Sequence, residues 1–345
     1  MTIRDRRELK QTAARRLQAA SYPAKKLILI HSGVALAAAM LVQVLTYLIQ
    51  EQIDAHSGLS GVQTRAMLET AASALRVIYN ILVPFWSMGL LHSALRLSRG
   101  HAAYPHTLAE GFRRFGPVLR LELMQLLIFG ILAFAAMYAS SMLFMFTPTG
   151  MEFAQMLEPM ILSGEFTDYM QLMEAIPQQT ILDLYKVVLP IFCVLALALI
   201  VPAFYRLRMA SYLVMDRSGT GAWKAIRTSN RIMRRKGFRL FLLDLSYWWY
   251  DVLAALAMVP MFADLLLPMV GIRLPLEDSV VMLIGYAVYG ALTLLLEVAV
   301  QPKRQTVYAL AYDALTEEYE QAQSVLPAQP VPYSDVYGNV PGNEE

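Results

Sequence analysis

The sequence predicts an all-α protein, a polytopic membrane bundle of six transmembrane helices. First, 57% of its 345 residues are hydrophobic and 16% are charged, whereas soluble domains are about half apolar and about a quarter charged. Second, the apolar residues gather in six runs, each long enough for the ~20 residues that a spanning helix needs. Third, the basic residues cluster between alternate runs. These observations together indicate a chain that is solvated by lipid.

The six runs define the expected membrane domain, residues 27–303. The first run is longer than the apolar core of a signal peptide and follows a 26-residue basic segment, so we favour a retained signal anchor over a cleaved one. The fifth contains Pro260, which predicts a kink because proline removes a helical hydrogen bond. The predicted spans cover about 27–50, 72–97, 117–146, 184–205, 238–267 and 279–301.

The distribution of charge predicts the orientation of the chain. A six-span topology places 25 of the 29 Lys and Arg residues on one side, in residues 1–26, 96–120, 206–239 and 302–304. The segments on the other side hold 11 of the 27 carboxylates. Basic residues are retained on the cytoplasmic side of a membrane. We therefore expect a multi-pass protein of the cell (plasma) membrane with both termini in the cytoplasm.

The two halves of the membrane region resemble each other. Aligning Arg120 at the start of span three with Arg239 at the start of span five also matches three following leucines. Each half has an apolar span, a basic segment and a second apolar span, which predicts a parallel internal repeat of the kind found in some transporters. Chance likeness between two basic-to-apolar boundaries explains the same pattern, and both interpretations stay open.

The most basic connection, residues 218–237, predicts an amphipathic cytoplasmic helix. Trp223, Ile226 and Met233 recur at helical spacing opposite the basic residues, and Gly237 can end the helix in a left-handed conformation. Such a helix would lie on anionic inner-leaflet lipid, where each basic residue contributes about 1 kcal/mol. Alternatively, the charges only enforce topology. Nucleic acid is not an expected partner, because no binding fold accompanies the patch. The basic residues are Lys224, Arg227, Arg231, Arg234, Arg235 and Lys236.

The remaining segments have distinct expected roles. Residues 1–26 predict a basic cytoplasmic helix, and residues 304–323 predict a second helix after the last span. Residues 147–183 lack Lys and Arg, and their apolar spacing predicts two short acidic helices outside the membrane, either a lid or an interfacial collar. Residues 324–345 are rich in proline and without apolar periodicity, which predicts a disordered tail that could bind a protein partner.

Charged residues within a span call for an explanation, since each costs about 2.5–3.5 kcal/mol at the centre of the bilayer. Asp244, Trp248 and Asp251 are spaced to share one face of span five. Asp251 is expected ~20 Å along the helix from Phe238, at 1.5 Å per residue. We expect no arginine at that depth. Asp251 and Asp244 are therefore a candidate polar site for a cation or a proton, with a hydrogen bond to tyrosine as the structural alternative.

Shallower charges predict a belt of ion pairs that joins the helices on the cytoplasmic side. Carboxylates near the inner ends of spans three, five and six are expected to meet arginines at the same level, which needs no ligand to explain it. The belt would contain Glu122, Asp244, Glu297, Arg206, Arg208 and Arg239.

Catalytic and metal-binding motifs are not recognisable. Cys193 is the one cysteine, the five histidines have no ligand spacing, and no GxSxG, Walker or HExxH pattern occurs. We therefore predict that the protein is not an enzyme and has no metal site and no cofactor.

The region around the basic connection is similar to the signature of a known family. Residues 222–249 read AWKAIRTSNRIMRRKGFRLFLLDLSYWW, residues 205–216 read YRLRMASYLVMD, and residues 6–10 read RRELK. The chain resembles the domain-of-unknown-function 975 family of bacterial integral membrane proteins. This resemblance implies a six-helix membrane fold and no assigned activity or catalytic residue. The Pro-rich tail and the long acidic segment depart from the family pattern, so their roles stay open.

Two functions are compatible with these features. The favoured one is a protein that moves a small solute or lipid, or supports a transporter. The alternative is a membrane scaffold or regulatory protein that holds anionic lipid through residues 220–236 and a partner through its C-terminal tail. A transporter should have a water-accessible cavity around Asp251, whereas a scaffold should have a packed core there.

Overall fold

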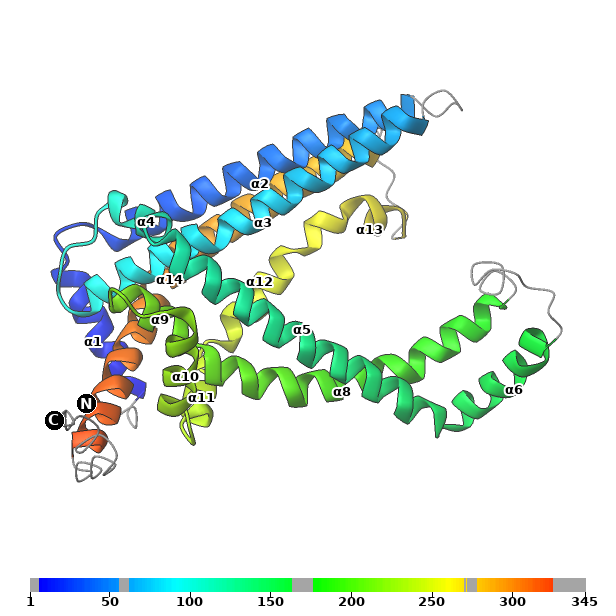
Figure 1. Cartoon of the computed structure of the whole chain (residues 1–345). Coiled ribbons are helices and arrows are strands. Elements are labelled where there is room, and N and C mark those ends of the chain that lie inside the picture. The colour runs from blue at the N-terminus through cyan, green and yellow to red at the C-terminus, as the bar shows by residue number, and fades with distance from the viewer. Residues whose placement is uncertain (1–5, 56–61, 163–175, 270, 272–277, 325–345) are drawn as a thin grey trace, which may run out of the picture.

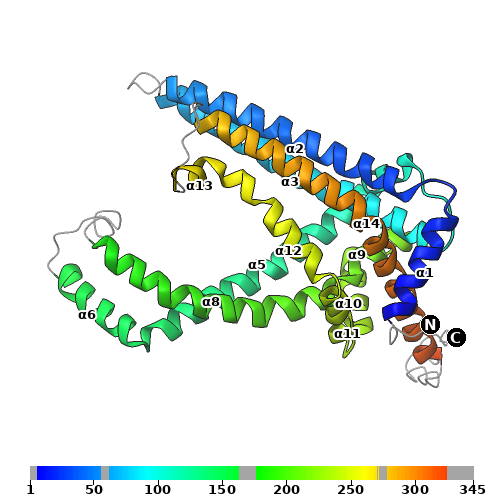
Figure 2. The ribbon, with the colours of Figure 1, turned by 180° about the vertical axis from the view of Figure 1, so that it is seen from behind.

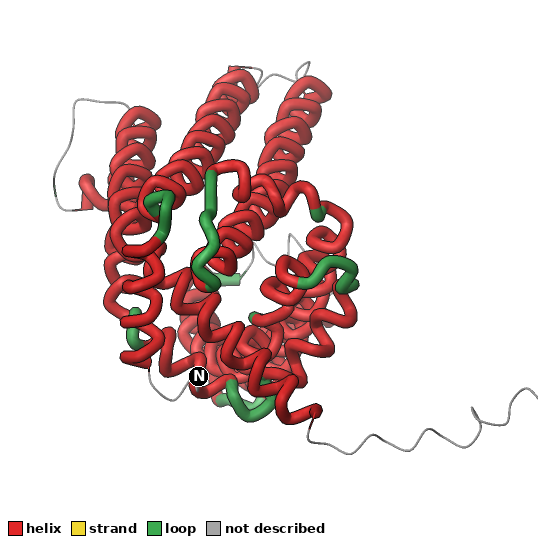
Figure 3. Tube along the Cα trace, turned by 90° about the vertical axis from the view of Figure 1, so that its left-hand side faces the viewer, coloured by secondary structure: helices red, strands yellow, loops and turns green. Residues whose placement is uncertain are grey.

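The computed structural model describes residues 6–55, 62–162, 176–269, 271 and 278–324. These residues form helices joined by turns and short loops, and they contain no strand (Figure 3). The prediction of an all-α fold is confirmed. The predicted tail beyond residue 324, and most of the second acidic helix before residue 176, lie outside the described residues.

Five helices are long and apolar enough to cross a membrane. A sixth candidate consists of two helices, α11 and α12, whose axes differ by 57°. The long helices are α2 (Ala24–Ala55), α3 (Val62–Ser98), α5 (Phe115–Met145), α8 (Gln178–Leu207) and α14 (Asp278–Ser324). The bent pair is α11 (Gly237–Leu245) and α12 (Trp248–Ala257), followed by η3 (Val259–Phe262) and α13 (Ala263–Met269). The other elements are α1 (Arg6–Ala19), η2 (Pro105–Ala109), α4 (Glu110–Arg113), α6 (Pro148–Leu162), α9 (Met209–Asp216) and α10 (Ala222–Ile232).

The long helices form two groups that diverge from one end of the molecule (Figure 1). α2, α3 and residues 278–301 of α14 run side by side, and we call them the three-helix arm. α5 and α8 pair with each other and form the two-helix arm. α12, η3 and α13 pack along α14, as the view from behind also shows (Figure 2). The end from which the arms diverge holds α1, α9, α10, α11 and the rest of α14, and we call it the junction.

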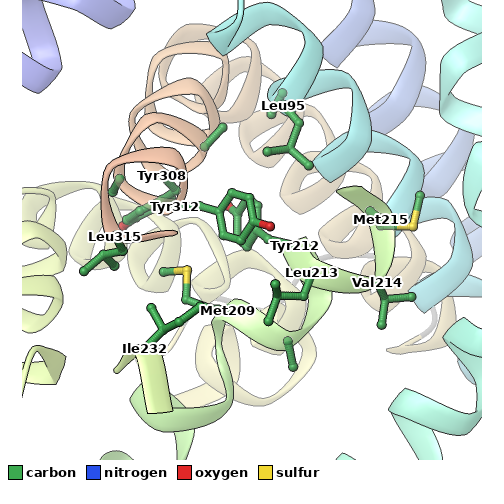
Figure 4. Packing of buried hydrophobic residues seen from close by; sticks show 14 of the residues in the cluster. Leu95, Met209, Tyr212, Leu213, Val214, Met215, Ile232, Tyr308, Tyr312 and Leu315 are labelled. Atoms are coloured by element: carbon green, nitrogen blue, oxygen red, sulfur yellow. The ribbon is translucent and has the colours of Figure 1, made fainter. Parts of the chain in front are cut away.

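The main buried core lies in the junction rather than between the long helices. Six of the eight residues of α9 are buried, and they pack against α3, α5, α10 and α14 (Figure 4). The rings of Tyr212 and Tyr312 stack there with their centres 5.2 Å apart. Along the arms, by contrast, large apolar side chains such as Leu126 and Leu295 are exposed. Lipid is the solvent that makes such exposure favourable, so the arms are built for a bilayer.

α14 continues without a break through Pro302, where the sequence predicted the end of the last span and a separate helix. Proline removes one backbone donor, and the Thr306 hydroxyl donates a hydrogen bond to the Pro302 carbonyl one turn later. Beyond the proline, Val307, Leu310 and Leu315 are buried in the junction. Burial of this apolar face outweighs the local cost of the proline, so one helix serves both as span and as core.

Span five is interrupted earlier than the proline predicted. Pro260 lies in the short 3-10 helix η3, but the larger bend separates α11 from α12 at Ser246 and Tyr247. α1 packs against this bend: Arg6 Nη1 donates to the Leu242 carbonyl at 3.1 Å, and Lys10 Nζ lies 3.5 Å from the Ser246 carbonyl oxygen. Backbone acceptors released at a helix end need such partners. The basic N-terminal helix therefore caps the break.

The connections agree in part with their predicted shapes. α6 forms the first of the two expected helices in the acidic segment and packs against α5 and α8. Two short helices follow each of α3 and α8. η2 and α4 follow α3, and α9 and α10 follow α8. The internal repeat stays a prediction.

Candidate functional site

Asp244 lies at the centre of a polar cluster that α8, α11 and α14 build in the junction. Its carboxylate accepts a hydrogen bond of 2.7 Å from the Tyr205 hydroxyl and another from the Tyr308 hydroxyl, and it forms an ion pair with Arg208. The Arg208 guanidinium lies 4.2 Å from the centre of the Tyr308 ring. The side chains of Arg208 and Asp244 are only 16% and 17% exposed. The structure therefore brings together one arginine and one carboxylate of the predicted belt.

The rest of the predicted belt is not assembled. Among the described residues, no ion pair includes Glu122, Glu297, Arg206 or Arg239. Arg206 contributes its carbonyl, which accepts a 2.7 Å hydrogen bond from the Ser229 hydroxyl. The belt prediction was based on depth along each helix alone, and rotation about the helix axis decides which side chains meet.

Asp251 does have an arginine partner, and the expectation that none was available is wrong. Arg304 Nη1 lies 3.1 Å from Asp251 Oδ1, and Arg304 Nε donates to the Tyr308 hydroxyl at 3.3 Å. Asp251 is also 55% exposed at its side chain, so it is not deeply buried. The reason is that the bend before α12 and the unbroken α14 bring these two residues to the same level. Trp248 is exposed, so the bend also separates it from Asp244.

A cavity of about 400 Å³ lies beside these ion pairs, between α3, α5, α8, α9 and α14. We call it the junction cavity. Its volume falls in the range of small-molecule sites, ~300–1,000 Å³. Its apolar wall consists of Leu91, Phe129, Phe204 and Leu207. Its polar wall consists of Gln125, Arg208, Ser211, Tyr212, Gln301, Arg304, Gln305 and Tyr308.

The polar wall of the junction cavity presents mainly hydrogen-bond donors. A guanidinium has five N–H donors, and the hydrogen bonds within the described chain use one donor of Arg208 and two of Arg304. No Asp or Glu is among the residues that line the cavity. Such a wall suits an anionic or acceptor-rich group, because Arg pairs readily with carboxylate and phosphate. The cation site expected at Asp244 and Asp251 is not what the geometry favours.

Sequence reasoning missed most of this cavity. Gln301, Arg304 and Gln305 are spaced to share one face of a helix, but a helix was predicted to end between them. Gln125 is a polar residue within predicted span three. Polar residues at matching depth in neighbouring spans were the available signal.

A second ionic cluster ties the elements together at the surface of the junction. Arg99, just after α3, lies 2.5 Å from Asp216 of α9 and 2.7 Å from Asp313 of α14. The Tyr312 hydroxyl donates to Asp216, and the Ser98 hydroxyl donates to Asp313. Hydrogen bonding to Asp216, reinforced by Asp313, raises the pKa of Arg99. This cluster fixes α3, α9 and α14 relative to one another, and these three helices contribute to the wall of the junction cavity.

The basic connection forms a helix, α10, but its apolar face does not point toward lipid. Ala225, Ile226 and Ile232 are buried in the junction core, whereas Trp223 is 59% exposed, contrary to prediction. Gly237 begins α11, and it is Arg235 that has a left-handed φ of 65°. The exposed side carries the basic residues Lys224, Arg227, Arg231, Arg234 and Arg235, while Lys236 pairs with Glu318 at 3.0 Å.

Long apolar helices with exposed apolar side chains, joined by a buried helical core, define a polytopic helical membrane protein. The chain belongs to the family described as protein of unknown function DUF975, whose family model matches residues 1–319. The match extends from α1 into the last turns of α14, so it includes every element of the junction. No match was found among curated proteins, and none among solved structures.

Proposed function

We propose that the protein lies in a bacterial cell membrane with both termini in the cytoplasm, and that it binds a small anionic solute or an anionic lipid headgroup in the junction cavity. Its role is to move that molecule or to support its movement, without enzymatic chemistry. The basic residues support this orientation, since 25 of the 29 fall in segments on one side of a six-span topology.

The junction cavity carries this proposal. Arg208 and Arg304 line a cavity of about 400 Å³ together with three glutamines and a serine. Each arginine is held by a carboxylate outside the lining, which fixes the guanidinium in place. The hydrogen bonds within the described chain leave other donors of each guanidinium for a ligand. Preorganised donors of this kind bind anions without a further ordering cost.

The opposite wall favours a ligand that also has an apolar part. Leu91, Phe129 and Phe204 line the same cavity. The helices that contribute them, α3, α5 and α8, continue into the arms, whose large apolar side chains are exposed. An amphiphilic anion would place its charge at the arginines and its apolar part along these side chains. A lipid headgroup and a free phosphate ester share this chemistry, and the test separates them.

The test is a binding titration of the full-length protein in phosphatidylcholine nanodiscs. Glycerol phosphate and short-chain phosphatidylglycerol are the two probes, measured by calorimetry. We expect Arg304→Gln and Ser211→Leu each to weaken binding at least tenfold, with Arg113→Gln as an exposed arginine control. Saturation by glycerol phosphate alone identifies a solute site, and saturation by the lipid alone identifies a headgroup site. Equal binding by all variants, or no binding of either probe, would refute the proposal.

The scaffold function is the second candidate, and one observation favours it. Arg231, Arg234, Arg235 and Lys236 border a surface cavity of about 570 Å³ with Glu318 and Tyr319. Anionic lipid at this surface, and a partner on the tail beyond residue 324, would make the protein a membrane scaffold. Changing Arg231, Arg234 and Arg235 to Gln should then lower the number of phosphatidylglycerol molecules that co-purify, counted by native mass spectrometry. An unchanged number would argue against this function.

A further inference from the structure

The three-helix arm contains two adjoining cavities that play no part in the junction site. They measure about 290 and 280 Å³. Both are lined by Leu36 and Ala39 of α2, Tyr79 of α3 and Tyr289 of α14. Because these four residues are common to both, the cavities adjoin between α2, α3 and α14, and we call the pair the route.

Polar side chains line this route along its length. Nearest the junction are His31, Ser32, Ser87, Thr293 and Glu297. Tyr79 and Tyr289 lie where the two cavities adjoin. Toward the far end of the arm are Gln43, Arg76, Asn80 and Tyr286. A helical arm that only crossed a bilayer would need none of these groups, since each polar residue in a span is costly.

Two of the groups nearest the junction have polar atoms without a partner among the described residues. Both ring nitrogens of His31 and the hydroxyl of Ser32 are buried without a hydrogen bond among the described residues, and Ser32 is only 6% exposed. Buried polar atoms are almost always satisfied by protein or water. A polar cavity of this size holds several water molecules, each occupying ≈ 30 Å³. The unpartnered polar atoms therefore predict water in the route.

The His31 ring is fixed rather than free to turn toward another partner. It stacks on the Trp86 ring with their centres 5.6 Å apart and their planes 5° from parallel. Trp86 Nε1 also donates to the His31 carbonyl at 2.9 Å. On the other side, Gly290 lets α14 approach α2 closely, because a Cβ there would lie 2.5 Å from Leu36 Cδ1. These contacts hold the imidazole at the wall of the route.

We propose that this route carries protons along the three-helix arm, with His31 and Glu297 as the groups that bind and release them. An imidazole and a carboxylate are the side chains that exchange protons most readily near neutral pH. Hydroxyls and water connect them to Tyr79 and Tyr289. Each transfer returns the donor to its starting state once the next proton arrives, so no other reactant is needed. Arg76 places a positive charge at the far end, where it opposes proton passage.

The first test measures proton entry into vesicles that contain the full-length protein and a trapped pH indicator. A potassium gradient with valinomycin supplies the driving force. We expect His31→Gln and Glu297→Gln each to lower the initial rate at least fivefold, and Arg76→Gln to raise it. The matched controls are His92→Gln and Glu122→Gln, which remove a histidine and a glutamate outside the route. A wild-type rate equal to that of protein-free vesicles, or unchanged rates in both route variants, would overturn the proposal.

A second test measures hydration directly and does not depend on those variants. Cys193 is the one cysteine, so Cys193→Ser provides a background without thiols. Ser32→Cys and Thr293→Cys lie on the route, whereas Val34→Cys and Leu292→Cys lie nearby on the exposed apolar faces of the same helices. We expect a small hydrophilic methanethiosulfonate to modify the route positions at least tenfold faster. Equal rates would show a dry route and contradict the proposal.

Discussion

Asp244 and Asp251 show how differently two carboxylates on neighbouring helices are used. Asp244 is only 17% exposed at its side chain and is bound by two tyrosines and Arg208, whereas Asp251 meets Arg304 at a more exposed position. Removing one partner of a buried pair leaves the other charge without compensation, whereas an exposed pair contributes little. The two sites therefore predict costs of different size for the same substitution.

Asp244→Asn should destabilise the protein by about 3–5 kcal/mol, the cost of an uncompensated buried charge. Asp251→Asn should cost less than Asp244→Asn, because the ion pair of Asp251 with Arg304 is the more exposed of the two. Reversible unfolding of the purified protein in mixed micelles measures both. A smaller effect at Asp244 than at Asp251 would mean that the buried cluster does not stabilise the junction.

Gly89 of α3 marks a close approach between the backbones of α3 and η2. A Cβ at Gly89 would lie 1.7 Å from the Leu108 carbonyl oxygen, and one at Gly111 would lie 1.9 Å from the Phe85 carbonyl oxygen. Backbone atoms cannot move aside as a flexible side chain can. α3 and the η2–α4 connection are therefore packed as closely as glycine permits.

Gly89→Ala should cost at least about 1–3 kcal/mol, the usual range for overpacking. Gly130→Ala is the matched control, because a Cβ at Gly130 has no heavy atom within 4 Å and alanine favours a helix over glycine. Thermal unfolding of the two variants gives the comparison. If both variants melted at the same temperature, the result would contradict the close packing of α3 against η2 at Gly89.

At the scale of the elements, α1 stabilises the break between α11 and α12. Arg6 and Lys10 donate to carbonyls at the end of α11, and Lys10 Nζ lies 4.4 Å from the centre of the Tyr247 ring. Burial, with help from Lys303 and Arg6, lowers the pKa of Lys10. The basic residues of α1 therefore have a structural role, in addition to the role in membrane topology that their charge predicts.

Replacing Arg6 and Lys10 by Ala should loosen this break without unfolding the arms. We expect backbone amides of residues 246–251 to exchange with deuterium at least tenfold faster, because the caps of the bend are lost. Arg15→Ala is the control, since the hydrogen bond of Arg15 within the described part of the chain is to Thr12 of the same helix. Unchanged exchange in the double variant would show that the bend is stable without α1.

The sequence predicts the helices better than it predicts their interruptions. Apolar periodicity identifies α2, α3, α5 and α8 because burial in lipid depends on composition along the chain. The bend at Ser246 and the continuity of α14 at Pro302 depend on contacts with α1 and the junction core, which lie far away in sequence. For the same reason, the pairing of Asp244 with Arg208 follows from depth, whereas the pairing of Asp251 with Arg304 does not.

The whole molecule joins two apolar arms through one buried junction (Figure 1). The junction cavity is lined by helices of both arms together with α9. The orientation of the protein in the membrane is a prediction from the distribution of its basic residues. In a Cys193→Ser background, Arg227→Cys should react with an impermeant thiol reagent only from the cytoplasm. Glu158→Cys, on α6, should react only from outside. Labelling of both positions from the same side would overturn the proposed topology.

The central claim is that Arg208 and Arg304 hold an anionic group in the junction cavity. The most direct measurement is an electron cryomicroscopy map of the full-length protein in nanodiscs that contain phosphatidylglycerol and glycerol phosphate. We predict density for a phosphate-sized group between the two guanidiniums, with Gln301 and Gln305 beside it. A cavity filled by the protein's own side chains, or by an acyl chain with no headgroup at the arginines, would contradict the claim.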